Sequence, residues 1–199
     1  DCKETICGGP DYPADPTDVI VRMGLCGPED KPREGPQRFI ALGSEHTCII
    51  DNRGSVQCWG SNEHGQREVP SDLGTAIAIA AGDSHTCAIE YGGQLKCWGS
   101  NAKGQRNIPD DLDSVIRVVA GTGHTCVLDT NLDVRCWGSE GSACNPGYDC
   151  GQSDVRDDVN TVIELAAGTF FTCVREDHRY ITCWGRNLYG ELHPPADVG

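Results

Sequence analysis

The stretch "CWGSNEHGQREVP", residues 58–70, returns as "CWGSNAKGQRNIP" at residues 97–109. A Cys-Trp-Gly triplet, a Ser-Asn-x-x-Gly-Gln turn and a proline occur in the same order, 39 residues apart. Repeats of this length are typical of proteins built from small units, each of which packs against its neighbours. The sequence therefore predicts a repeat protein.

A second phrase shows that the repeat occurs four times. It ends in a cysteine and stands at "LGSEHTC" (42–48), "AGDSHTC" (81–87), "AGTGHTC" (120–126) and "AGTFFTC" (167–173). Ten residues after each of these cysteines, another cysteine precedes Trp-Gly. The third copy is eight residues longer than the others, and the insertion falls within residues 139–150.

Each copy is predicted to consist of short strands. The small apolar run "AIAIAAG" (76–82) is typical of a crowded, buried strand, and "HTCAIE" (85–90) with "QLKCWG" (94–99) is typical of a hairpin. A last short strand is expected to end at Pro70 or Pro109, at the outer edge of the sheet, because proline disrupts a central ladder. About four strands in each repeat predict the blades of a β-propeller.

The hairpin tips differ between copies. The first two tips end in Gly54 and Gly93, where a three-residue loop favours a left-handed residue. Leu132 and Arg179 take that place in the third and fourth copies. We therefore expect those two tips to differ from the first two.

The predicted architecture is all-β, a β-propeller of four recognisable blades preceded by an irregular segment. Residues 1–37 lack the Cys-Trp-Gly phrase, contain cysteine and many prolines, and are predicted to be an extension or linker. The propeller repeats are predicted for residues 38–199, with blades at about 38–76, 77–115, 116–162 and 163–199. Such blades form either a complete small ring or an arc of a larger propeller.

The phrase "AGxxHTCAI…G.LKCWGSNxxGQ" resembles the repeat of the regulator of chromosome condensation family, and the resemblance covers residues 38–199. The 39-residue step with a proline after Gly-Gln is similar to the compact blades of β-lactamase inhibitor protein II. Relatives of this kind commonly form seven blades, so the resemblance favours an arc. Their blades do not generally need a cysteine pair, whereas each copy here contains one.

The 13 cysteines predict disulfides and an oxidising compartment. The Cys-x9-Cys spacing is not that of a zinc site, and facing hairpin positions lie within disulfide reach. We expect two of Cys2, Cys7 and Cys26 to pair with each other. The other pairs are predicted within blades and across the insertion: Cys48–Cys58, Cys87–Cys97, Cys126–Cys136, Cys173–Cys183 and Cys144–Cys150. The protein is therefore predicted to be secreted or at the cell surface.

The recurring polar and aromatic residues are predicted to be structural. A residue that returns in every blade is expected to pack blades together, and no catalytic or metal-binding motif is found. We therefore predict no catalytic residue, no metal site, no cofactor and no enzymatic activity. This interpretation covers His46, His85 and His124 before Thr-Cys, the tryptophans Trp59, Trp98, Trp137 and Trp184, and the turn-capping aspartates Asp72, Asp111, Asp158 and Asp197.

Charge and hydropathy narrow the classes of partner. Thirty acidic and 16 basic residues give a net charge of −14, which disfavours nucleic acid. No segment approaches the roughly 20 apolar residues of a membrane helix, so membrane insertion is not expected. Protein partners remain, including other copies or domains of the same surface assembly.

The predicted function is a non-catalytic extracellular propeller, a structural or adhesive protein-interaction module of a secreted or cell-surface protein or appendage. The alternative is a secreted protein inhibitor of an enzyme, which the resemblance to β-lactamase inhibitor protein II implies. Loops on a rigid scaffold are where recognition normally occurs. The predicted contacts are Asn145 and Tyr148 in the insertion and Tyr189 in the fourth turn.

Overall fold

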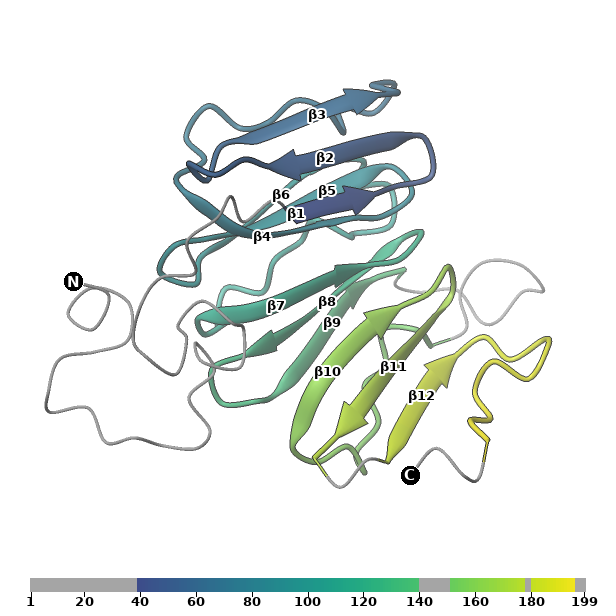
Figure 1. The fold of residues 1–199 in the computed structure, drawn as a ribbon. Helices are drawn as coiled ribbons and strands as arrows, with labels where there is room; N and C mark the ends of the chain where they lie inside the picture. The colour runs from purple at the N-terminus through teal and green to yellow at the C-terminus, as the bar shows by residue number, and fades with distance from the viewer. Residues whose placement is uncertain (1–38, 140–150, 178–179, 196–199) are drawn as a thin grey trace, which may run out of the picture. The chain divides into compact units, whose positions relative to one another are not determined.

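The computed structural model describes residues 39–139, 151–177 and 180–195 (Figure 1). The chain divides into two compact units, Asp1–Gln37 and Arg38–Gly199, and all described residues belong to the second. They form four three-stranded antiparallel sheets, each sheet being one blade. The all-β propeller prediction is confirmed. None of the residues described belongs to a helix that is long and apolar enough to span a membrane.

The strands follow one another in chain order within each blade, and the second of each three is central. The first strand of blades two, three and four begins one residue before the predicted start of the blade. The first two blades contain β1 (Phe39–Leu42), β2 (His46–Ile50) and β3 (Val56–Gly60), then β4 (Ala76–Ala81), β5 (His85–Glu90) and β6 (Leu95–Gly99). The last two contain β7 (Val115–Ala120), β8 (His124–Asp129) and β9 (Val134–Gly138), then β10 (Val162–Ala167), β11 (Phe171–Glu176) and β12 (Ile181–Gly185).

The prediction of a fourth strand in each blade is wrong for the described residues, which form three strands per blade. The segment between β3 and β4 consists of tight turns and irregular backbone. The Gly65 N–H donates to the Asn62 carbonyl at 3.2 Å, and the Leu73 N–H donates to the Pro70 carbonyl at 3.0 Å. Local turns therefore use backbone donors that a strand would need for a ladder, and Pro70 has no N–H to offer.

The apolar core lies between successive blades. Side chains along the middle strand point alternately to its two faces. Those in the first, third and fifth positions face the following blade, and those between them face the preceding blade. In the fifth position, Ile50, Ile89 and Leu128 each pack in a cluster with a tryptophan of the next blade, which is respectively Trp98, Trp137 and Trp184. The second and third blades thus each bury one face against the blade before and one against the blade after.

The last residue of the hairpin tip is left-handed in each of the first three blades. Gly54 and Gly93 adopt φ values of 79° and 82°, as predicted, and Leu132 adopts 68°. The expectation that the third tip differs is therefore wrong. Arg179 lies outside the described residues.

A carboxylate stabilises the left-handed leucine. The Asp129 Oδ1 atom accepts the N–H groups of Asn131 and Asp133, at 2.8 and 3.0 Å, on either side of Leu132. Asp51 makes the same pair of bonds in the first blade. The acidic side chain fixes the turn, so glycine is not required at its last position.

Candidate functional site

Four disulfides join the middle and third strands, one in each blade. Each bond links residues that face each other in the register of the two strands, with 4.1 Å between the Cα atoms. The pairs are the predicted ones, Cys48–Cys58, Cys87–Cys97, Cys126–Cys136 and Cys173–Cys183. The predicted Cys144–Cys150 bond lies outside the described residues.

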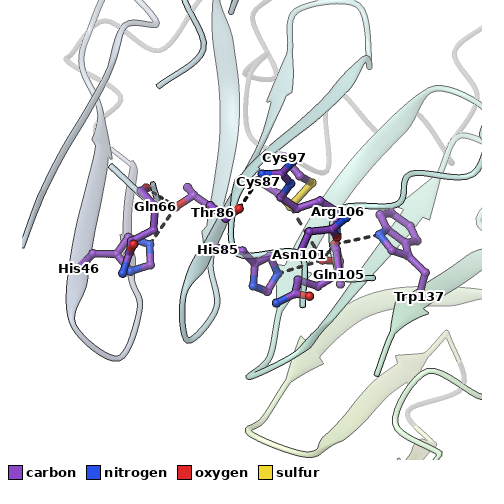
Figure 2. The surroundings of a disulfide bond; sticks show 12 residues. His46, Gln66, His85, Thr86, Cys87, Cys97, Asn101, Gln105, Arg106 and Trp137 are labelled. Carbon is purple, nitrogen blue, oxygen red and sulfur yellow. Dashed lines mark hydrogen bonds between the residues drawn. A yellow bond between two sulfur atoms is a disulfide. The ribbon is translucent and has the colours of Figure 1, made fainter. Parts of the chain in front are cut away.

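The repeated histidine, threonine, glutamine and tryptophan meet between blades one and two, and Figure 2 shows His46, Thr86 and Gln66 of this contact. The Thr86 hydroxyl donates to the Gln66 carbonyl at 3.0 Å, and the Trp98 indole N–H donates to the same oxygen at 2.9 Å. His46 Nε2 lies 2.8 Å from the Thr86 Oγ1 atom. Because the single hydroxyl proton goes to Gln66, the histidine carries its proton on Nε2 and donates it to Thr86.

The same interface unit recurs at the two following blade contacts. It takes a histidine and a glutamine carbonyl from one blade, and a threonine and a tryptophan from the next. All of its hydrogen-bond distances lie between 2.8 and 3.0 Å. The members are His85, Gln105, Thr125 and Trp137 (partly shown in Figure 2), and then His124, Gln152, Thr172 and Trp184.

A glycine allows the blades to approach closely beside each histidine. A Cβ atom at Gly82 would lie 2.3 Å from the His85 ring and 2.3 Å from the Gly121 carbonyl oxygen of the next blade. At Gly121 the corresponding distances are 2.1 Å to His124 and 2.6 Å to the Gly168 oxygen. The glycines of the first three phrases, Gly43, Gly82 and Gly121, are therefore required by packing between blades.

Burial keeps these histidines neutral. Loss of hydration lowers the pKa of His46, and it lowers the pKa of His85 to about 4. In the fourth blade the same place is held by Phe171, which has no titratable group. The histidines are thus packing residues, as predicted. Among the residues described, no group of three or more His, Cys, Asp or Glu side chains could hold a metal ion.

The recurring aspartates form ion pairs on the outside of the blades. Asp72 lies 3.1 Å from the Lys96 ammonium of the next blade, and Asp111 lies 2.9 Å from the Arg135 guanidinium. Asp158 pairs instead with the neighbouring Arg156. The prediction of turn capping missed that Asp72 and Asp111 link neighbouring blades. Asp197 lies outside the described residues.

The Ser-Asn-x-x-Gly-Gln turn is an ordered platform that presents two exposed side chains. In the first copy the Asn62 side-chain oxygen accepts the Arg67 N–H, and the Gln66 side-chain oxygen accepts the His64 N–H. The second copy repeats both bonds. In the fourth, Glu191 replaces glutamine and accepts the Tyr189 N–H at 2.7 Å. The exposed pairs are Glu63-His64, Ala102-Lys103 and Leu188-Tyr189.

Of the three predicted partner-binding residues, Tyr189 is the one that lies among the described residues. Tyr189 is 87% exposed, at the turn after β12, so it is accessible to a partner. Asn145 and Tyr148 lie outside the described residues. The segment that contains them leaves the end of β9, and Ser139 anchors its start by donating to the Gly123 carbonyl at 3.0 Å.

One tryptophan departs from the predicted inter-blade packing. Trp98, Trp137 and Trp184 are each 4% exposed, whereas Trp59 of the first blade is 49% exposed. The local sequence gives no signal of this difference, because "CWGSN" around Trp59 and Trp98 is the same. Burial of the tryptophan depends on the blade before it.

The repeats match a known family model, that of the regulator of chromosome condensation (RCC1) repeat. The match covers residues 38–66, 76–105 and 115–144, which follow the first three blades. Over these three stretches the chain is therefore similar to RCC1 repeats. The further resemblance to β-lactamase inhibitor protein II stays a prediction.

Solved structures with RCC1-like blades are similar to the chain. The CRINKLY WD40 ectodomain of the Arabidopsis thaliana receptor kinase ACR4 is 25% identical over 73% of the chain, with a TM-score of 0.58. The ectodomain of the Physcomitrella patens receptor kinase CR4 is 20% identical over 78%, with a TM-score of 0.60. Prp20p from Saccharomyces cerevisiae is 18% identical over 80%, with a TM-score of 0.64.

These similarities concern part of each relative. The matches span 49%, 43% and 47% of the three solved chains, so this chain corresponds to about half of each. The comparisons with CR4 and Prp20p, at 20% and 18% identity, show the fold alone. No curated protein sequence was found to match the chain.

Proposed function

We propose that the chain is a non-catalytic, extracellular RCC1-type propeller that binds a protein partner through its turns. It serves as a structural or adhesive module of a secreted or cell-surface protein or appendage. One observation carries the proposal: the repeated polar residues bond between blades, and the residues left exposed and variable are those of the turns.

The extracellular part of the proposal rests on the disulfides. Four bonds within 162 residues are rare in the reducing cytosol and common in secreted domains. The 25% identity to a receptor-kinase ectodomain is consistent with the same compartment. An oxidising surface location therefore fits both the chemistry and the similarity.

The absence of catalysis is supported by the state of the repeated side chains. An acid–base role near neutral pH needs an accessible group with a pKa close to 7. His85 is fully buried, donates to Thr125, and has its pKa lowered to about 4. His46 is buried and bonded in the same way to Thr86.

The protein partner is supported by the turn platforms. Side-chain oxygens of Asn62 and Gln66 fix the backbone, so the exposed pair between them loses little conformational freedom on binding. The insertion at 139–150 occupies the place of such a pair in the third blade, and Asn145, Tyr148 and Tyr189 are the proposed contacts. The solved structure of Prp20p was reported with its binding properties to Gsp1p and histones, which gives a precedent for protein partners of the fold.

The inhibitor function receives less support from the exposed aromatics. A blade rim that covers an active site is expected to gather aromatic residues at one end of the strands. Tyr91 and Tyr180 lie at hairpin tips, whereas Tyr189 follows β12 at the opposite end. We therefore do not propose an inhibitor.

Shortening the insertion tests the proposal. Residues 139–150 are replaced with Ser-Asn-Ala-Lys, which is the turn of the second blade, and the control replaces Ala102-Lys103 with Gly-Ser. Both variants and the unchanged chain are labelled and applied to an array of surface and secreted proteins from the source organism. We expect one protein on the array to bind both the unchanged chain and the control. The shortened chain should no longer bind it, although its melting temperature should equal that of the unchanged chain. Equal binding by all three would contradict the proposal.

A further inference from the structure

A cavity of about 350 Å³ lies beside the edge strand of the second blade. One wall is residues 93–96, at the start of β6, and the other is residues 108–109 and 112–115, within the segment that leads to β7. This segment, residues 108–115, is called here the second linker. Pockets that bind small ligands have volumes of about 300–1,000 Å³, so the cavity has room for one side chain of a partner.

The edge strand offers unpaired main-chain groups to the cavity. β6 is the last strand of the order β4-β5-β6. Cys87 and Cys97 face each other with 4.1 Å between their Cα atoms, which is the close spacing of a pair that exchanges no main-chain hydrogen bonds. Leu95, two residues before Cys97, forms a pair of the same kind with Ile89. Its N–H and C=O groups therefore point away from β5, towards the free side of the sheet.

The cavity has apolar walls and one available carboxylate. Leu95, Ile108 and Leu112 supply apolar surface. Asp113 also lines the cavity, and its Oδ2 atom accepts a side-chain N–H of Asn131, at 3.0 Å, from the hairpin tip of the third blade. This bond orients the carboxylate and leaves its Oδ1 atom available. No Lys or Arg among the described residues forms an ion pair with Asp113.

The charges around the cavity favour a cationic ligand. Lys96 is part of the lining, but its ammonium lies 3.1 Å from the carboxylates of both Asp72 and Glu90, so its charge is neutralised. Of the three aspartates in the second linker, Asp111 is the one that pairs with a cation of the described residues, Arg135. The remaining negative charge attracts a cationic group and repels an anionic one.

We propose that this cavity binds the lysine or arginine side chain of an extended segment of a protein partner, and that the main chain of this segment pairs with Leu95. A residue opposite Leu95 projects its side chain on the same face of the sheet as Leu95 does. Its aliphatic stem then contacts Ile108 and Leu112, and its cationic head donates to Asp113. Peptides that add a strand to a sheet edge are held by this combination of main-chain bonds and side-chain pockets.

The carboxylate is specific to the second blade. Gly74 and Asn160 hold the place of Asp113 in the segments that lead to β4 and β10, so neither segment has an acidic group there. The inference does not rest on partner binding by the turns. The cavity lies at the start of β6, whereas the turn at 100–105 follows the end of that strand.

Titration of a peptide into the ¹⁵N-labelled chain, followed by ¹H–¹⁵N correlation spectra, is the measurement. The probe is acetyl-Thr-Val-Arg-Val-Thr-amide, and we expect saturable shifts at the amides of Leu95, Ile108 and Asp113. The peptide with glutamate in place of arginine should not bind. N-methylation of the arginine removes its main-chain donor and should weaken binding at least about threefold. An arginine peptide that leaves these amides unmoved, or a glutamate or N-methylated peptide that binds equally well, would overturn the proposal.

Two matched variants test the role of the carboxylate. Asp113→Asn removes the charge but keeps an acceptor for Asn131, and it should weaken binding of the arginine peptide at least about threefold. Asp110→Asn removes a charge of the same linker outside the cavity lining and should leave the affinity unchanged. The chain with the shortened 139–150 insertion should bind the peptide as tightly as the unchanged chain, which separates this site from binding by the turns. Equal affinities of the two aspartate variants, or loss of peptide binding on shortening the insertion, would contradict the inference.

Discussion

At the scale of single residues, the glycine before each histidine is the most constrained position of the blade contact. A Cβ atom at Gly82 meets the backbone oxygen of Gly121, which cannot rotate away, and the ring of His85. We expect Gly82→Ala to lower the free energy of unfolding by about 3 kcal/mol, measured by urea denaturation, because overpacking forces the blades apart. Gly74→Ala is the control, since its Cβ atom would meet only Glu90 at an ordinary 3.5 Å. Equal effects of the two changes would contradict this account of the interface.

The buried histidines make stability depend on pH. The pKa of His85 is lowered from 6.5 to about 4 by burial, so the unfolded chain binds a proton before the folded one does. The neutral His85 therefore contributes about 3 kcal/mol to the free energy of unfolding. This contribution is fully present above pH 6.5 and is lost as the pH falls towards 4. His85→Phe, which copies the fourth blade, removes this titration. The difference in unfolding free energy between the two proteins should therefore shrink between pH 7.5 and 4.5, and a constant difference would show that His85 is not buried and neutral.

At the scale of strands and hairpins, the disulfide ties each blade internally. The Cys87–Cys97 bond closes a small loop between β5 and β6. Replacing both cysteines with alanine is expected to cost about 3 kcal/mol of unfolding free energy on the chain-entropy model. Peptide mapping without reduction should show this loop intact in the unchanged chain. A link from Cys87 to a cysteine of another blade would refute the assigned register.

Most strands could be predicted from sequence because their signals are local. The Thr-Cys and Cys-Trp-Gly phrases locate β5 and β6 by alternation and by the turn between them. The fourth strand was predicted wrongly because the Gln66 carbonyl bonds to Trp98 in another blade, a contact that no local pattern contains. Leu132 was mispredicted because the stabilising carboxylate of Asp129 outweighs the usual preference for glycine.

At the scale of the whole molecule, repetition predicts which residues are structural but not which of the repeated tryptophans is exposed. Trp59 and Trp98 have the same flanking sequence, yet one is exposed and the other buried. The fourth blade could be predicted only in part: Phe171 was visible as a departure from the repeat, whereas the Arg175–Glu164 ion pair became visible only once β10 and β11 were paired. Contacts between blades are tertiary, so single phrases cannot specify them.

The central claim is that blades stack through a tryptophan bonded to the preceding blade, whereas Trp59 of the first blade is exposed. The chain has four tryptophans, so four indole N–H signals are expected in a ¹H–¹⁵N correlation spectrum. After transfer to D₂O, three signals should persist, those of Trp98, Trp137 and Trp184, whose N–H groups are buried and bonded to Gln66, Gln105 and Gln152. The signal of Trp59 should vanish first. Loss of all four at one rate, or persistence of the Trp59 signal alongside the others, would contradict the account.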